Sequence, residues 1–221
     1  MASFGIPRSA KALKRKSRGF LELKRILIVC EGSKTEPHYL KALIRSLGLR
    51  ATSVLVIGEE CESAPISVYE YAEARFLEDP PFDEVFCVFD RDRHPSLDSA
   101  CQAIESHASK LFKAIISHPC FEYWILLHFR YTRAPFVAQG ANSPGAMVLK
   151  AVKEVWPQYA KGSSEVFAQL DKDNRLSLAI EHAKRAQADA KVTGELNPST
   201  DFHTLVIRLQ EVAKEQLQPQ R

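Results

Sequence analysis

The chain has 221 residues, of which 45% are hydrophobic and 26% charged, and its net charge is +3. This composition is typical of a soluble globular protein, and no apolar run approaches the ~20 residues of a membrane-spanning helix. Five cysteines without a Cys-x-x-Cys pair argue against a disulfide framework or a zinc site. The polar, basic amino terminus has no apolar signal segment, so we expect a reducing, cytoplasmic location.

The positive charge is concentrated at the amino terminus. Residues 1–25 contain eight Lys or Arg and one Glu, so this segment carries +7 and the remainder carries −4. A basic arm on a mildly acidic body suits a nucleic acid partner, although many basic termini are simply solvated. We expect residues 1–24 to form a flexible arm with four candidate phosphate contacts: Lys14, Arg15, Lys16 and Arg18.

After the arm, predicted strands alternate with predicted helices. Apolar runs rich in β-branched and aromatic residues predict strands over 25–30, 52–57, 84–89 and 112–117. Helical patterns follow them over 36–47, 65–76, 96–109 and 121–129, with Thr35 as the expected N-cap of the first helix. This alternation predicts an α/β fold with a mostly parallel four-stranded sheet and helices on both faces.

From residue 139 onwards the periodicity is helical. We expect helices over 143–156, 164–170, 174–191 and 201–217. No linker separates this part from the preceding one. We therefore expect an α/β domain over 25–135 and a helical extension over 136–221 that packs on it.

Acidic residues follow two of the predicted strands. Glu31 and Glu36 come after the first strand, and Asp90 and Asp92 come after the third. Open α/β sheets bind ligands at the carboxyl ends of their strands, where these carboxylates are expected to converge. Converging carboxylates repel one another unless a cation neutralises them, and oxygen ligands suit Mg²⁺ or Mn²⁺. The sequence therefore predicts a divalent-metal site for phosphate chemistry.

The same residues also have structural explanations. An Asp-x-Asp segment can be a solvated turn whose acids pair with Arg91, and a glutamate in a first helical turn, such as Glu36 or Glu122, is favoured by the helix dipole alone. Glu122 is nevertheless a candidate fifth ligand, and Lys34 and Arg91 are candidate nucleic acid contacts. The roles of three histidines stay open: His94, His118 and His203.

These motifs resemble a known group of proteins. A strand followed by Glu-Gly and a later strand followed by Asp-x-Asp resemble the Toprim domain of topoisomerases, primases and OLD-type nucleases. The segments VCEGSKTEPHYL, FDRDRH, HPCFEYWILLHF and NPSTDFHTLV resemble the RloB family over nearly the whole chain after the arm. The chain has no G-x-x-x-x-G-K-[ST] segment, so it is not itself a P-loop ATPase.

The resemblance implies a Toprim-like fold and a Mg²⁺-dependent endonuclease acting on DNA or RNA, with transfer RNA as one candidate substrate. RloB-like proteins are similar to nuclease subunits of antiphage abortive-infection systems, and an ABC-type ATPase (RloA-like) is the implied partner in a homo- or hetero-oligomer. OLD-type nucleases use a lysine after the acids, for which Lys161 is the candidate here. The resemblance thus assigns catalysis to Glu31, Asp90, Asp92 and Lys161, and metal binding to Glu31, Glu36, Asp90, Asp92 and Glu122.

Two alternatives to a nuclease stay open. The chain can be a non-catalytic module that binds nucleic acid or a nucleotide, with a metal site that is structural or absent. It can also be a regulatory subunit that docks on the ATPase. The substitutions Glu31→Gln and Asp90→Asn separate these possibilities, since they should abolish a nuclease and leave a binding module nearly intact.

Overall fold

A computed structural model describes residues 24–58, 64–78, 81–91 and 94–217. Five strands form one sheet in the order β2-β1-β3-β4-β5. The first four strands are parallel and the fifth is antiparallel to β4. Their bounds are β1 (Ile26–Cys30), β2 (Val54–Ile57), β3 (Glu84–Asp90), β4 (Phe112–His118) and β5 (Ser199–Thr200).

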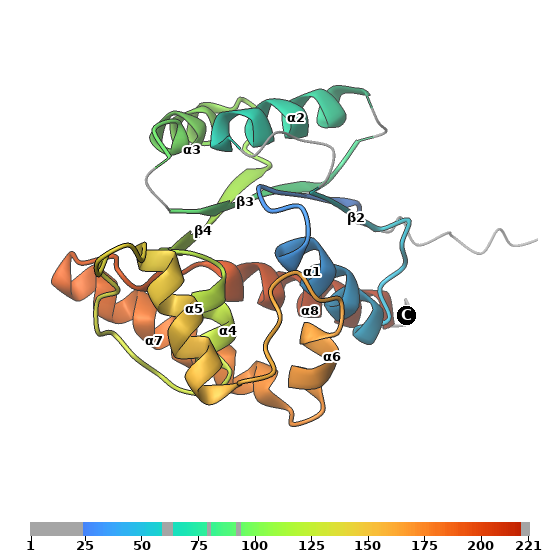
Figure 1. Ribbon diagram of the computed structural model, residues 1–221. Helices are drawn as coiled ribbons and strands as arrows, with labels where there is room; N and C mark the ends of the chain where they lie inside the picture. The colour runs from blue at the N-terminus through green and yellow to red at the C-terminus, as the bar shows by residue number, and fades with distance from the viewer. Residues whose placement is uncertain (1–23, 59–63, 79–80, 92–93, 218–221) are drawn as a thin grey trace, which may run out of the picture.

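Helices cover both faces of the sheet, as Figure 1 shows. One face carries α2 (Pro65–Glu78) and α3 (Leu97–Ser106). The other face carries the remaining helices of the described chain: α1 (Thr35–Ser46), α4 (Glu122–Leu127), α5 (Pro144–Val155), α6 (Val166–Asp171), α7 (Arg175–Thr193) and α8 (Phe202–Leu217).

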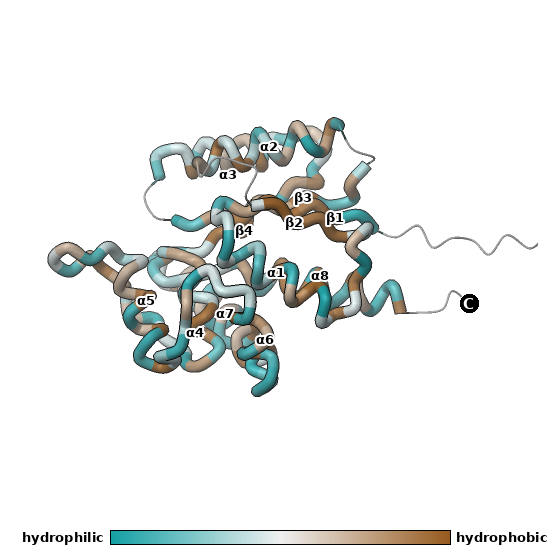
Figure 2. The backbone as a smooth tube through the Cα atoms, turned by 45° about the vertical axis from the view of Figure 1, so that its right-hand side comes forward, coloured by the Kyte–Doolittle hydropathy of each residue, from teal (hydrophilic) through white to brown (hydrophobic). Residues whose placement is uncertain are grey.

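The continuous apolar run of β1 is explained by the two cores that it separates. Ile26, Ile28 and Cys30 point into the larger core with α1 and α4–α8, whereas Leu27 and Val29 point into the smaller core under α2 and α3. All five side chains are fully buried, which is why no polar residue interrupts the strand. The part of the backbone trace at β1, β2 and β3 is accordingly coloured as strongly hydrophobic in Figure 2.

The predicted α/β class is confirmed, with a mostly parallel sheet between helices and a C-terminal helix. The sheet has one strand more than predicted, because Ser199 and Thr200 pair with the end of β4. A two-residue strand leaves no periodicity in the sequence, so only the tertiary pairing reveals it. The predicted N-cap was also wrong: Thr35 is already helical, and Lys34 occupies the N-cap position without a side-chain hydrogen bond.

Within the described part of the chain, no helix is both long enough and apolar enough to cross a membrane. The division into an arm, an α/β domain and a helical extension remains a prediction. Residues 1–23, which include the four candidate phosphate contacts of the predicted arm, lie outside the described residues.

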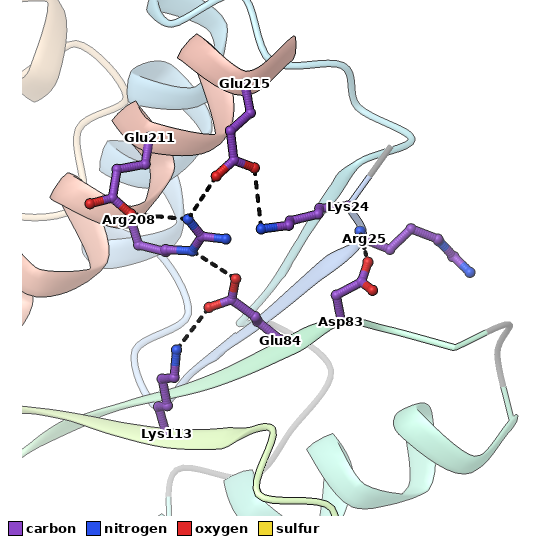
Figure 3. A network of polar contacts seen from close by, with 8 residues as sticks. All are labelled: Lys24, Arg25, Asp83, Glu84, Lys113, Arg208, Glu211 and Glu215. Carbon is purple, nitrogen blue, oxygen red and sulfur yellow. Dashed lines mark hydrogen bonds and ion pairs between the residues drawn. The ribbon is translucent and has the colours of Figure 1, made fainter. Parts of the chain in front are cut away.

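A network of ion pairs fastens α8 to the amino edge of the sheet (Figure 3). Arg208 of α8 lies 2.7 Å from a carboxylate oxygen of Glu84, the first residue of β3, and Lys113 of β4 lies 2.8 Å from the other oxygen. Glu215 completes the network, at 3.3 Å from Arg208 and 3.2 Å from Lys24. Burial by itself would raise the pKa of Glu84, but the hydrogen bonds from Lys113 and Arg208 outweigh burial and lower it.

We predict that Arg208→Met lowers the free energy of unfolding by about 1–3 kcal/mol, because it leaves the largely buried Glu84 carboxylate without its partner from α8. Urea titrations of wild type and variant measure this. Since the pKa of Glu84 is lowered on folding, its contribution is present at neutral pH and is lost as the pH falls through that lowered pKa.

The control is Arg130→Met, which removes an exposed ion pair with Glu154 at 3.4 Å. A surface pair of this kind contributes about 0–1 kcal/mol. Equal destabilisation by the two substitutions would contradict a structural role for the network.

Candidate functional site

Glu31 and Asp90 lie at the carboxyl ends of the adjacent strands β1 and β3. Glu31 follows β1 directly, and its backbone N–H donates to the carbonyl of Val88 on β3 at 3.0 Å. Its side-chain Oε2 accepts a hydrogen bond from the backbone N–H of Asp90 at 3.1 Å. The parallel pairing of β1 and β3 therefore brings Glu31 and Asp90 together, as the sequence predicted.

Asp90 also joins the sheet to α4. Its Oδ1 accepts a hydrogen bond from the backbone N–H of Phe121 at 2.8 Å, at the start of that helix. Burial raises the pKa of Asp90 well above its usual range, and the negative charges of Glu36, Glu122 and Glu31 raise it further. The surroundings of Asp90 therefore disfavour its ionised form, and a bound cation would stabilise that form.

Glu36 lies in the first turn of α1 and is only 7% exposed. Its carboxylate packs directly against Gly32, where an added Cβ would lie 2.2 Å from Oε2. A side chain at position 32 would therefore displace the Glu36 carboxylate. Burial raises the pKa of Glu36, and the charge of Glu122 adds to the effect. A dipole-favoured surface glutamate would not be buried in this way, so the alternative explanation for Glu36 is insufficient.

Glu122 is the most deeply buried of these acids, with 2% of its surface exposed. Its Oε1 lies 3.0 Å from the ammonium group of Lys161 and accepts a hydrogen bond from the hydroxyl of Tyr159 at 3.4 Å. Burial disfavours the charged form of Lys161, but the Glu122 carboxylate outweighs this and raises the pKa of Lys161. The lysine singled out through the family resemblance is therefore brought to the acidic cluster.

The loop that carries Lys161 is anchored on α1. The ring Nδ1 of His38 lies 2.9 Å from the carbonyl oxygen of Gly162, which has φ +79. A Cβ on Gly162 would lie 3.4 Å from the Cβ of Lys34, so this loop passes close to the turn after β1. Lys34 itself is exposed, next to the loop, where it is accessible to a ligand.

Arg91 and Asp92 complete the predicted set. Arg91 donates its backbone N–H to the carbonyl of Ser117 at 2.8 Å, and its guanidinium lies 3.6 Å from Asp98. Asp92 lies outside the described residues, so its predicted place in the metal site remains a prediction.

The histidines divide into different environments. His94 makes a local contact with Ser96, and the buried His203 contacts the Thr200 carbonyl at 3.2 Å. Burial lowers the pKa of His118, and the charge of Arg91 lowers it further. Its buried Nδ1 has no hydrogen-bond partner among the described residues.

A divalent cation fits the chemistry of this cluster. The donors are carboxylate oxygens, which Mg²⁺ and Mn²⁺ prefer, and burial, together with the charges of neighbouring carboxylates, raises the pKa values of Asp90 and Glu36. Within the described ranges, no three His, Cys, Asp or Glu side chains are arranged to hold one ion by themselves. Water, substrate oxygens or Asp92 would have to supply the remaining ligands.

A cavity of about 380 Å³ opens beside these residues. Its charged end includes Asp90, Arg91, Glu122 and Lys161, whereas Glu31 and Glu36 do not line it. Sequence reasoning missed both this cavity and the hydroxyl of Tyr159. The remaining lining residues are His118, Pro119, Cys120, Phe136, Val137, Ala138, Ser143, Pro144, Gly145, Ala146, Leu149 and Asn197.

A glycine at the end of β2 was also missed. A Cβ on Gly58 would lie 2.4 Å from the ring of Pro37 and 2.6 Å from the carbonyl oxygen of Gly32. Gly58 therefore lets β2 end against the turn that presents Glu31. The only sequence signal for it is a glycine directly after a predicted strand.

Comparison with known proteins agrees with the resemblance of the motifs. A family model described as RloB-like protein matches residues 26–209, which is most of the chain. No curated protein and no solved structure is significantly similar to the chain.

We predict that Gly32→Ala lowers the free energy of unfolding by about 1–3 kcal/mol, because its Cβ would overlap the Glu36 carboxylate. The same substitution in a Glu36→Ala background should cost less than half as much, which urea titration of the four proteins measures. Gly145→Ala is the control, since its Cβ would meet Cys120 Sγ at an ordinary 3.6 Å. Purely additive effects of the two substitutions would refute the contact.

We further predict that Asp90→Asn raises the melting temperature of the metal-free protein by about 2–4 °C, the shift expected for about 1 kcal/mol. Asparagine can still accept the Phe121 hydrogen bond, and it removes a charge that the folded state disfavours. Mg²⁺ should then raise the melting temperature of the wild type more than that of the variant.

Thermal unfolding in chelator and in Mg²⁺ tests this, with Glu70→Gln on the exposed face of α2 as a control that should change neither value. An Asp90→Asn variant less stable than the wild type in chelator would show that the carboxylate is not under electrostatic strain.

Proposed function

The chain belongs to the RloB-like family, and on this premise we propose that it is a divalent-metal-dependent nuclease that hydrolyses phosphodiester bonds in DNA or RNA. The observation that carries the proposal is the gathering of Glu31, Asp90, Glu36 and Glu122 at the carboxyl edge of one parallel sheet, with Lys161 among them. Ligands of open α/β folds bind at this edge.

In the proposed site, Glu31, Asp90 and Asp92 would hold one divalent cation, and Glu36 and Glu122 would complete a second position. Bound Mg²⁺ or Mn²⁺ supplies Lewis-acid polarisation of the phosphate and lowers the pKa of a bound water.

Residues of the chain itself orient the acidic side chains and offset negative charge at the site. The Phe121 N–H fixes the orientation of Asp90 at 2.8 Å, and the Tyr159 hydroxyl restrains Glu122. The side chain of Lys161 is 60% exposed, so its ammonium group is accessible to a phosphate as well as paired with Glu122. It can therefore offset the negative charge that develops on the phosphate during hydrolysis.

We also propose that the chain is the effector of an antiphage abortive-infection system, with an ABC-type ATPase of the RloA-like kind as its partner. Family membership is the support for this part of the proposal. The segment of the predicted basic arm would add phosphate contacts that are independent of sequence.

A non-catalytic module is the second candidate, and one observation favours it. Oε1 of Glu122 is already occupied by Lys161 and Tyr159, and no complete three-ligand group is formed by the described residues. Such a module would bind nucleic acid or a nucleotide, or dock on the ATPase, without cleaving a bond.

Calorimetric titration with Mg²⁺ and Mn²⁺ followed by incubation with plasmid DNA and with total transfer RNA, with and without the ATPase, separates the two candidates. We predict that Glu31→Gln and Asp90→Asn each weaken metal binding by about a hundredfold or more, beyond the ten- to hundredfold typical of outer-shell substitutions. Both variants should lose cleavage of whichever polymer the wild type cuts.

Glu70→Gln serves as the control and should leave metal binding and cleavage unchanged, because this acid is exposed on α2 away from the cluster. A wild-type chain that binds neither metal would overturn the nuclease proposal in favour of the non-catalytic module.

A further inference from the structure

The lining of the cavity beside the acidic cluster combines a charged group of residues, here called the charged end, with an apolar group, here called the apolar end. The charged end comprises Asp90, Glu122, Arg91 and Lys161, with Lys161 3.0 Å from Glu122 and Arg91 3.6 Å from Asp98. Lys161, whose side chain is 60% exposed, and a divalent cation held by the carboxylates would both attract a phosphate group to this end. The apolar end is formed by six residues: Phe136, Val137, Ala138, Pro144, Ala146 and Leu149.

The apolar wall is held in place by tertiary contacts. The backbone N–H of Phe136 donates to Oδ1 of Asn197 at 3.3 Å, and Nδ2 of Asn197 donates to the carbonyl of Phe136 at 2.8 Å. The Phe136 ring also packs edge-on against Tyr123 at a centroid distance of 6.5 Å. The loop that forms this wall is therefore fastened to the segment before β5, although 61 residues separate the two in the sequence.

The start of α5, which also lines the cavity, is held by local contacts. Ser143 caps α5 by accepting a hydrogen bond from the backbone N–H of Ala146 at 3.2 Å, which fixes the first turn of this 12-residue helix. Gly145 lies next to Cys120, where an added Cβ would be 3.6 Å from Sγ. The helix start thus lies close to the β4–α4 connection and brings small side chains to the cavity.

Two residues of this wall, Phe136 and Leu149, pack against the larger hydrophobic core, but the others are not part of it. Val137 is 56% exposed, and Ala138 is exposed as well, although both line a cavity. An apolar surface that is held rigidly and left accessible next to charged groups is typical of a ligand site. Its volume of about 380 Å³ is at the small end of the ~300–1,000 Å³ range of small-molecule pockets.

We infer that the apolar end receives the base of one unpaired nucleotide while its phosphate lies at the charged end, so that the chain acts on single-stranded nucleic acid or on a nucleotide extruded from a paired region. The inference rests on the proposed function, since it names the substrate class of the same site. A cavity of this size has room for one nucleotide, whereas a paired base would bring the partner strand with it. Enzymes that act on a base inside a duplex extrude it into such a pocket.

The apolar wall carries no predicted selectivity for one base. Among its residues, Phe136 offers a ring and the others offer aliphatic surface, and the Asn197 amide is occupied by the backbone of Phe136. Stacking on such surfaces tolerates every base because each has a flat π-face. Single-strandedness, rather than sequence, is therefore the property that this end of the cavity selects.

The test compares binding of adenosine monophosphate and cytidine monophosphate with that of ribose phosphate, which lacks the base, to the full chain in Mg²⁺. Isothermal calorimetry should show both nucleotides binding about tenfold more tightly than ribose phosphate, the order expected for stacking of one base. Equal affinity for all three compounds would overturn the inference.

Two variants locate the effect. Ala146→Phe narrows the apolar end and should remove the preference for nucleotides over ribose phosphate while Mg²⁺ binding stays unchanged, because Ala146 offers no metal ligand. Ala74→Phe on the exposed surface of α2 is the matched control and should retain the preference. Retention of the preference in Ala146→Phe would place the base elsewhere and overturn the inference.

Assays with polymers distinguish a failure of this inference from a failure of the proposed function. Cleavage or binding of a single-stranded oligonucleotide should exceed that of the same strand in a duplex. Cleavage of a polymer by a chain that binds ribose phosphate as tightly as nucleotides would leave the nuclease intact and refute the base cavity. A base preference without cleavage of any polymer would support the cavity and refute the nuclease.

Discussion

The whole site depends on the parallel pairing of β1 with β3. Ile26 is opposite Glu84 and Cys30 is opposite Val88, so Glu31, directly after β1, lies beside the last residues of β3 and within hydrogen-bond distance of Asp90. A shift of one residue in this register would exchange the buried faces of β1 between the two cores and turn Glu31 away from Asp90. The fully buried side chains on both faces of β1 prevent such a shift. Hydrophobic packing in the sheet thus maintains an arrangement of charges that would not assemble by itself.

Burial and charge oppose each other at the carboxyl edge. Folding partly or wholly buries three acids: Glu36, Asp90 and Glu122. Among the described residues, a lysine forms an ion pair with Glu122 but not with the other two. Stability alone would favour amides or apolar residues at these positions. Proteins retain such unfavourable groups where a ligand repays their cost, which is the physical argument for a cation or a phosphate at this edge.

Much of this arrangement could be predicted from local sequence patterns. The apolar run before Glu31 and the one before Asp90 indicate neighbouring buried strands, and parallel strands present their carboxyl ends at one edge. Lys161 could be found only through the family resemblance, because it lies in a loop 39 residues after Glu122 with no local pattern to mark it. The cavity wall was out of reach for a related reason: the contact between Phe136 and Asn197 spans 61 residues and leaves no periodicity in either segment.

The ion-pair network around Arg208 also shows where labels or tags can be attached to the molecule. Lys24, two residues before the start of β1, pairs with Glu215, close to the end of α8, at 3.2 Å. The described chain therefore begins and ends at one place on the surface (Figures 1 and 3). This place is at the amino edge of the sheet, and the acidic cluster is at the carboxyl edge, one strand length away. A fluorescent label or an affinity tag attached at Lys24 or Glu215 would therefore be on the side of the sheet opposite the acids and would not block the cavity. A pair of labels at these two positions would report whether α8 is docked.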